Sequence, residues 1–109
     1  MKHAILLVSL LAGACASQPA PRSSLTVTDY MRLQDAREQA FAAPTGQQSM
    51  WMNVLTGLGG TVTPTSDPAP AGARTCRQLQ QVTRSIDGRL DDRAVTACRD
   101  GTGALSFDN

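Results

Sequence analysis

Apolar residues recur at helical spacing in the segment TVTDYMRLQDAREQAFAA, which begins at Thr26 of the 109-residue chain. The positions that share one face of the 3.6-residue period are Tyr30, Leu33, Ala36 or Arg37, Ala40 and Phe41. Either Thr28 or Asp29 is suited to cap the start, and a proline and a glycine follow the last apolar position. We therefore predict a helix over residues 25–44 that packs its tyrosine, leucine and phenylalanine into the core.

The pattern changes after this helix. SMWMNV and GTVTPT are short and rich in large or β-branched residues, and TGLGG between them is a turn signal. We predict a β-hairpin with strands near residues 49–55 and 60–65. Pro64 lacks a backbone N–H, so the second strand either lies at an edge or ends there. Residues 66–73, SDPAPAGA, are predicted to form a loop.

Two secondary structures compete in the last third of the chain. Helical spacing connects Cys76, Leu79, Val82 and Ile86, which would suit a helical hairpin. A glycine in the connection and two Val-Thr pairs favour strands instead. If residues 86–88 form a three-residue loop with Gly88 in the left-handed conformation, Cys76 lies directly opposite Cys98. The segment GTGALSF then supplies a further turn and a terminal strand.

The first residues have the pattern of an export signal. A short basic start, MKH, precedes the apolar core AILLVSLLA, which is too short to span a bilayer because a helix needs roughly 20 apolar residues. Three processing routes are compatible with the residues that follow. Signal peptidase could cut after Ala14 or after Ala16, or LAGAC could serve as a lipobox in which Cys15 becomes acylated.

The number of cysteines favours acylation. The chain has three cysteines, and an odd cysteine in an exported protein needs to be consumed. If Cys15 carries a lipid, Cys76 and Cys98 remain to form a disulfide. We predict a lipoprotein signal peptide over residues 1–14 and a lipidated cysteine with a flexible tether over residues 15–24. The eight residues SQPAPRSS favour an extended backbone of roughly 25 Å.

Composition limits the size of the core. Hydrophobic residues make up 41% of the chain, but aromatic residues make up only 4%. Such a small core usually needs a disulfide or a partner. We predict an α+β or mainly β fold, in which the N-terminal helix precedes a small four- or five-stranded antiparallel β domain over residues 45–109. Trp51 is interpreted as the main core anchor, with an exposed contact as the alternative.

The residues that catalysis most often uses are scarce. The single histidine, His3, lies in the predicted signal, so the mature chain has neither the usual general base nor the commonest metal ligand. Adjacent strand residues point to opposite faces, so Asp91 and Asp92 do not converge. Ten basic residues against nine acidic ones give no basis for nucleic-acid binding. We predict a protein that is not an enzyme and that uses no cofactor or metal.

Two arginines, Arg77 and Arg99, each follow one of the paired cysteines. Together they could form a basic spot for phosphate or for peptidoglycan carboxylates. The alternative is that they only flank the disulfide, because surface charges are common and contribute little. With Trp51, they are the candidate binding residues.

Several motifs of the chain resemble the seventeen-kilodalton surface-antigen family, which comprises small outer-membrane lipoproteins first known from rickettsiae. The matching pieces, in order, are AP-TGQ at 43–47, Trp51, Asn53, Thr56-Gly57, GTVTPT at 60–65, CR at 76–77, Gln81, GR at 88–89, TACR at 96–99 and Gly103. The chain departs from the family pattern at Val54, Leu55, Leu79 and Leu105. It also lacks the glycine-zipper segment found in many relatives.

The resemblance implies a small antiparallel sheet behind a lipid anchor and favours strands in the last third. It also implies a surface-antigen-like protein anchored in the outer membrane by palmitate and other acyl chains, facing the periplasm or the cell surface. After Cys15 comes Ala16 rather than aspartate, which resembles the pattern sorted to the outer membrane. We expect a non-enzymatic binding or scaffolding role, with an envelope protein or peptidoglycan as partner. The alternative is a freely secreted, disulfide-stapled binding or inhibitor module.

Overall fold

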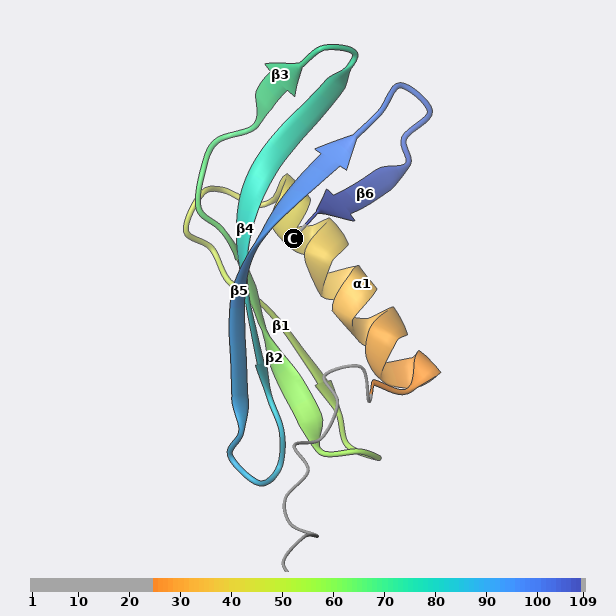
Figure 1. Ribbon diagram of the computed structural model, residues 1–109, viewed down its shortest axis with the longest axis vertical. Coiled ribbons are helices and arrows are strands. Elements are labelled where there is room, and N and C mark those ends of the chain that lie inside the picture. Colours follow the sequence, from red (N-terminus) through yellow and green to blue (C-terminus); the bar gives the residue numbers. More distant parts are fainter. Residues whose placement is uncertain (1–24, 109) are drawn as a thin grey trace, which may run out of the picture.

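The computed structural model describes residues 25–108, and it consists of one helix packed on one face of a six-stranded antiparallel sheet (Figure 1). The elements are α1 (Val27–Ala42), β1 (Ser49–Asn53), β2 (Leu58–Pro64), β3 (Ala69–Ala71), β4 (Arg74–Arg84), β5 (Leu90–Arg99) and β6 (Leu105–Asp108). The strand order is β1-β2-β4-β5-β6, and β3 pairs with the part of β4 that β2 does not reach. The predicted α+β class, with a helix before an antiparallel sheet, is confirmed.

Helix α1 begins two residues later and ends two residues earlier than predicted, and its cap is Thr26. The Thr26 hydroxyl accepts a hydrogen bond from the Asp29 backbone N–H (3.1 Å), and the Asp29 carboxylate accepts one from the Thr26 N–H (2.9 Å). This reciprocal pair is a capping box. The prediction that Thr28 or Asp29 is the cap was therefore wrong, although Asp29 takes part in the cap.

The buried face of α1 differs from the predicted face at one position. Leu33 and Phe41 are buried as expected, but Tyr30 is 49% exposed. Asp29 takes the inward position instead, because residue 29 lies four residues before Leu33 on the same helix face. The prediction that Tyr30 packs into the core was therefore wrong.

The hairpin of β1 and β2 forms as predicted, with a shorter first strand. β1 ends at Asn53 because the Asn53 carbonyl accepts hydrogen bonds from the N–H groups of Thr56 (3.2 Å) and Gly57 (2.9 Å), which closes a turn. β2 ends at Pro64, as the missing N–H requires, but it is not an edge strand because β4 pairs with it.

The segment predicted to be a loop contains the short strand β3, so that prediction was wrong. Its three residues pair with Arg74–Cys76 across a turn at Gly72, whose φ of +67° favours glycine. Because β3 is an edge strand, it tolerates Pro70, which has no N–H to donate. This additional strand brings the sheet to six strands rather than four or five.

The last third forms strands rather than a helical hairpin. Gly88 has a φ of +87°, and the Ser85 N–H donates to the Arg89 carbonyl (3.0 Å), which closes the predicted three-residue loop. The resulting register places Cys76 opposite Cys98, and the two form the predicted disulfide.

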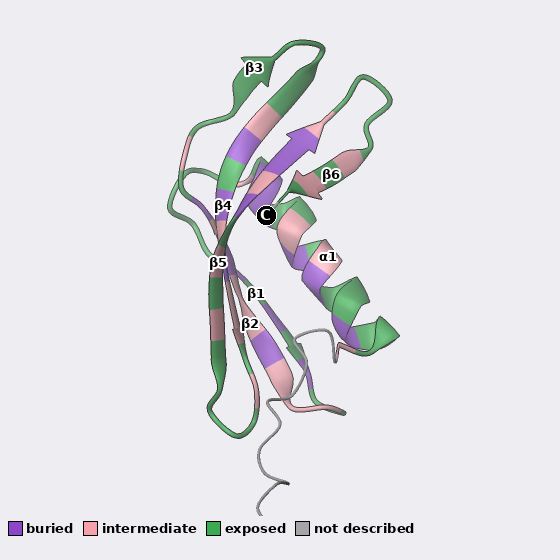
Figure 2. Ribbon diagram, in the orientation of Figure 1, coloured by how far each residue is buried: buried purple, intermediate pink, exposed green. Residues whose placement is uncertain are grey.

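The core lies between α1 and the sheet. Its buried residues are Leu33, Ala36, Ala40, Phe41, Trp51, Val62, Leu79 and Ala97. Along β1 the residues alternate between buried and exposed (Figure 2). The exposed positions are Met50 and Met52, which therefore lie on the face of the sheet that the helix does not cover. Within residues 25–108, no helix has the length and apolar character needed to cross a membrane.

Candidate functional site

Arg77, a predicted binding residue, extends from β4 beneath the C-terminal end of α1 and is only 4% exposed. Its guanidinium donates five hydrogen bonds of 2.6–3.3 Å; the acceptors are the carbonyl oxygens of Ala40, Phe41, Ala43 and Ser66 and the hydroxyl of Thr45. The last carbonyls of a helix lack partners within the helix, and a cation stabilises that end. Arg77 therefore caps α1 and holds the following loop, and its burial keeps the guanidinium away from a ligand.

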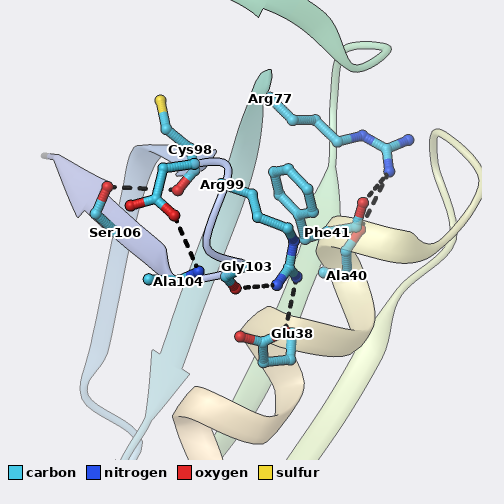
Figure 3. A network of polar contacts seen from close by, with 10 residues as sticks. Glu38, Ala40, Phe41, Arg77, Cys98, Arg99, Gly103, Ala104 and Ser106 are labelled. Atoms are coloured by element: carbon cyan, nitrogen blue, oxygen red, sulfur yellow. Dashed lines mark hydrogen bonds and ion pairs between the residues drawn. The ribbon is translucent and has the colours of Figure 1, made fainter. Parts of the chain in front are cut away.

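Arg99 lies on the other side of Phe41 and is partly exposed (Figure 3). Its guanidinium donates to the Glu38 carboxylate (2.8 Å) and to the Gly103 carbonyl (2.7 Å), and it lies 5.0 Å from the centre of the Phe41 ring. These contacts hold the β5–β6 turn against α1. The two arginines thus fasten strands to the helix, and the structure does not combine them into a basic surface spot.

The disulfide lies on the face of the sheet opposite the arginines. Neighbouring strand residues alternate in direction, so Cys76 and Cys98 point away from α1 while Arg77 and Arg99 point toward it. Figure 3 shows the Cys98 sulfur directed away from the helix. Cys15, the predicted lipidation site, lies outside the described residues.

Trp51 is the core anchor that the sequence predicted, and it is 7% exposed. It lies opposite Gly60 of β2, where a side chain does not fit because a Cβ atom would lie 2.0 Å from the Val82 carbonyl oxygen. The indole Nε1 has no acceptor within residues 25–108. The apolar surroundings of the indole identify it as a packing group rather than an exposed contact.

A buried carboxylate that the sequence analysis missed joins α1 to the β1–β2 turn. Asp29 Oδ1 accepts hydrogen bonds from Thr56 Oγ1 (2.6 Å) and Asn53 Nδ2 (2.8 Å), while Oδ2 accepts the backbone N–H of Thr26. Burial raises the pKa of the Asp29 carboxyl, but the hydrogen bonds from Thr56, Thr26 and Asn53 lower it by more, so this pKa lies below its ordinary value. The sequence signal for this position of Asp29 is the spacing T-x-x-D from Thr26 to Asp29, which is typical of a capping box.

Asp29→Asn is expected to lower the free energy of unfolding by about 2 kcal/mol near pH 7, because the amide places a donor or a weaker acceptor where a charged acceptor is needed. The folded-state pKa of Asp29 is depressed. Its contribution is therefore present above the unfolded-state pKa of about 4 and is lost as the pH falls through the folded-state value. Urea unfolding near pH 7 and near pH 2.5 measures both the loss and its decrease in acid.

Asp91→Asn is the control for this measurement. Asp91 pairs with Arg93 at 2.7 Å on the partly exposed surface. A pair of this kind contributes less than about 1 kcal/mol. If Asp29→Asn lowered the free energy of unfolding equally near pH 7 and near pH 2.5, the assignment of Asp29 as a charged acceptor that holds the helix would be contradicted.

A shallow open cavity of about 260 Å³ lies beside the β1–β2 hairpin. The residues around it include Met50, Met52, Thr61, Val82 and Arg84, so its surface is mainly apolar with one cation at the side. Within residues 25–108, no three His, Cys, Asp or Glu side chains gather in a way that could hold a metal ion. Asp91 pairs with Arg93 and Asp92 with Gln80, so these carboxylates do not converge, as predicted.

The site residues therefore divide by role. Arg77, Arg99 and Asp29 join the helix to the sheet, and Trp51 fills the core. An apolar surface beside β1 remains open to a partner. No protein-family model, curated protein or solved structure matches the chain.

Proposed function

We propose that the protein is a non-enzymatic, lipid-anchored protein of the bacterial cell envelope, of the surface-antigen type, with a binding or scaffolding role. In this proposal Cys15 carries acyl chains that anchor the protein in the outer membrane, and the α+β domain faces the periplasm or the cell surface. An envelope protein or peptidoglycan is its partner, and it binds no nucleic acid.

The observation that carries the proposal is the Cys76–Cys98 disulfide. With two of the three cysteines paired, Cys15 is the one that remains, and it directly follows LAGA after an apolar segment of signal length. Acylation uses this thiol and so leaves no unpaired cysteine in an oxidising compartment.

The non-enzymatic part of the proposal is supported by the composition of the chain and by the roles of its charged groups. Past residue 3 the sequence contains no histidine. The buried charged groups Asp29 and Arg77 form hydrogen bonds that hold the helix, which leaves them no role toward a substrate. A small domain of this kind is suited to binding a partner through its surface.

Metabolic labelling with an alkyne analogue of palmitate tests the anchor. We expect the wild-type chain to incorporate the label and Cys15→Ser to lose it. The matched control carries Cys76→Ala and Cys98→Ala, so it loses two cysteines but keeps Cys15. It is expected to keep the label. An unlabelled, soluble mature chain that begins at Ser17 would instead establish the freely secreted module.

A further inference from the structure

Large apolar side chains are exposed at one end of the molecule. Six of them come from β1, the β1–β2 turn and the β4–β5 hairpin, and we call them the apolar end: Met50, Met52, Val54, Leu55, Ile86 and Leu90. Leu55 and Ile86, in the two turns, are 86% and 83% exposed. At the opposite end of the described chain, the β3–β4 and β5–β6 turns expose no large apolar side chain (Figure 1).

The two turns form one surface. A methyl group placed on Gly57 in the β1–β2 turn would lie 2.9 Å from the Cβ atom of Ile86 in the β4–β5 turn. The turns are therefore in contact, although 29 positions of sequence separate these two residues. A continuous exposed apolar surface of this kind marks a site that contacts a partner or a membrane.

The described part of the chain begins at the same end. Asp29, in the first turn of α1, is hydrogen-bonded to Asn53 and Thr56, which bracket the β1–β2 turn. Leu25, the first described residue, therefore lies near this turn. Ten positions separate Leu25 from Cys15, so the connection spans at most about 35 Å. A lipid on Cys15 would keep the apolar end within reach of a membrane surface.

Two exposed arginines complete the surface. Arg84 and Arg89 flank Ile86 in the β4–β5 hairpin, and both are exposed. The acidic residue between them, Asp87, is engaged within the turn by the Ser85 hydroxyl and the Arg89 N–H. Long cationic side chains next to an apolar surface reach toward phosphate groups while their stems stay in apolar surroundings.

We propose that the apolar end docks into the interface of a phospholipid bilayer, with Leu55 and Ile86 below the headgroups and Arg84 and Arg89 at the lipid phosphates. The inference extends the proposed function and rests on the anchor for the orientation of the domain and for the choice of a bilayer as the occupant. Buried apolar area and attraction to anionic lipid both strengthen interfacial binding. The described chain begins at this end, ten positions after Cys15, which favours a bilayer over a soluble protein as the occupant.

Tryptophan quenching by brominated phospholipids tests the insertion. In the full acylated chain reconstituted into vesicles of phosphatidylethanolamine and phosphatidylglycerol, Leu55→Trp is expected to lose about half of its added emission when the acyl chains are brominated. Ala73→Trp, in the exposed β3–β4 turn at the opposite end, is the matched control and is expected to lose none. Equal quenching of the two variants would overturn the proposal.

A second measurement decides the docking independently of the anchor. The unacylated Cys15→Ser chain is expected to sediment with the same vesicles, and Leu55→Asp with Ile86→Asp is expected to weaken this binding at least about tenfold. Because both side chains are exposed, the melting temperature should stay unchanged, and Ala73→Asp should bind like its parent. If the parent does not bind vesicles, the docking proposal fails while palmitate labelling at Cys15 still stands. If the parent chain instead forms a dimer, and the variant with Leu55→Asp and Ile86→Asp does not, the apolar end is assigned to contact with a second copy.

Discussion

Arg77→Met is expected to lower the free energy of unfolding by about 4 kcal/mol, the largest effect of any single substitution that we propose. Methionine fills a similar volume, so the loss reports on the polar contacts rather than on a cavity. The substitution leaves the carbonyl groups that Arg77 satisfies, at the end of α1 and at Ser66, without a donor in places that are buried or partly buried. Buried acceptors that lose their partners cost about 1–3 kcal/mol each, and partial relaxation reduces the sum.

Urea unfolding followed by Trp51 fluorescence measures this loss. Arg84→Met is the matched control, since Arg84 lies on the same strand and is exposed. Its effect is expected to stay within about 0.5 kcal/mol. Arg77→Lys should recover part of the stability, because an ammonium group keeps the charge but reaches fewer carbonyls. Equal effects of Arg77→Met and Arg84→Met would show that Arg77 does not hold the helix end.

Replacement of both Cys76 and Cys98 by alanine is expected to lower the free energy of unfolding by about 3 kcal/mol. The bond closes a loop with a sequence separation of 22 residues, and opening it gives the unfolded chain more conformational freedom. For a domain of this size the melting temperature should fall on the order of 15 °C. Thermal unfolding followed by circular dichroism checks this value.

Reduction of the wild-type protein provides the control for the disulfide. Wild-type protein kept reduced throughout the unfolding measurement should reach the stability of the double alanine variant, because both lack the same cross-link. The reduced and double alanine proteins should keep the same strand register, since the turn at Gly88 sets it. A double alanine variant as stable as the oxidised wild type would contradict the role of the bond in stabilising this small core.

Local chemistry explains which parts of the fold could be predicted. The register of β4 and β5 follows from the length of one loop and a single glycine, Gly88, so the sequence was sufficient to place the cysteines opposite each other. The strand β3 escaped prediction because its pairing with β4, rather than any pattern of its own, makes it a strand. Its sequence, APA, has low β propensity.

The roles of the charged residues depend on groups that are distant in the sequence. Arg77 resembles any surface arginine in an alternating strand, and it becomes buried only because the end of α1, 34–37 positions earlier, supplies carbonyl acceptors. In the same way, Asp29 faces inward because Asn53 and Thr56 bring donors to it. A hydrophobic pattern assigns such positions to apolar residues, which is why Tyr30 was expected inside.

Side chains from the sheet and its turns hold both ends of α1. Asn53 and Thr56 bind the start of the helix, and Arg77 binds its end. An isolated helix of 16 residues is barely stable in water, and fraying normally starts at its termini. Here neither terminus can fray without breaking contacts to β-structure. Helix and sheet therefore lose their order in one cooperative transition, and the backbone amides of α1 share the protection against hydrogen exchange that the central strands provide.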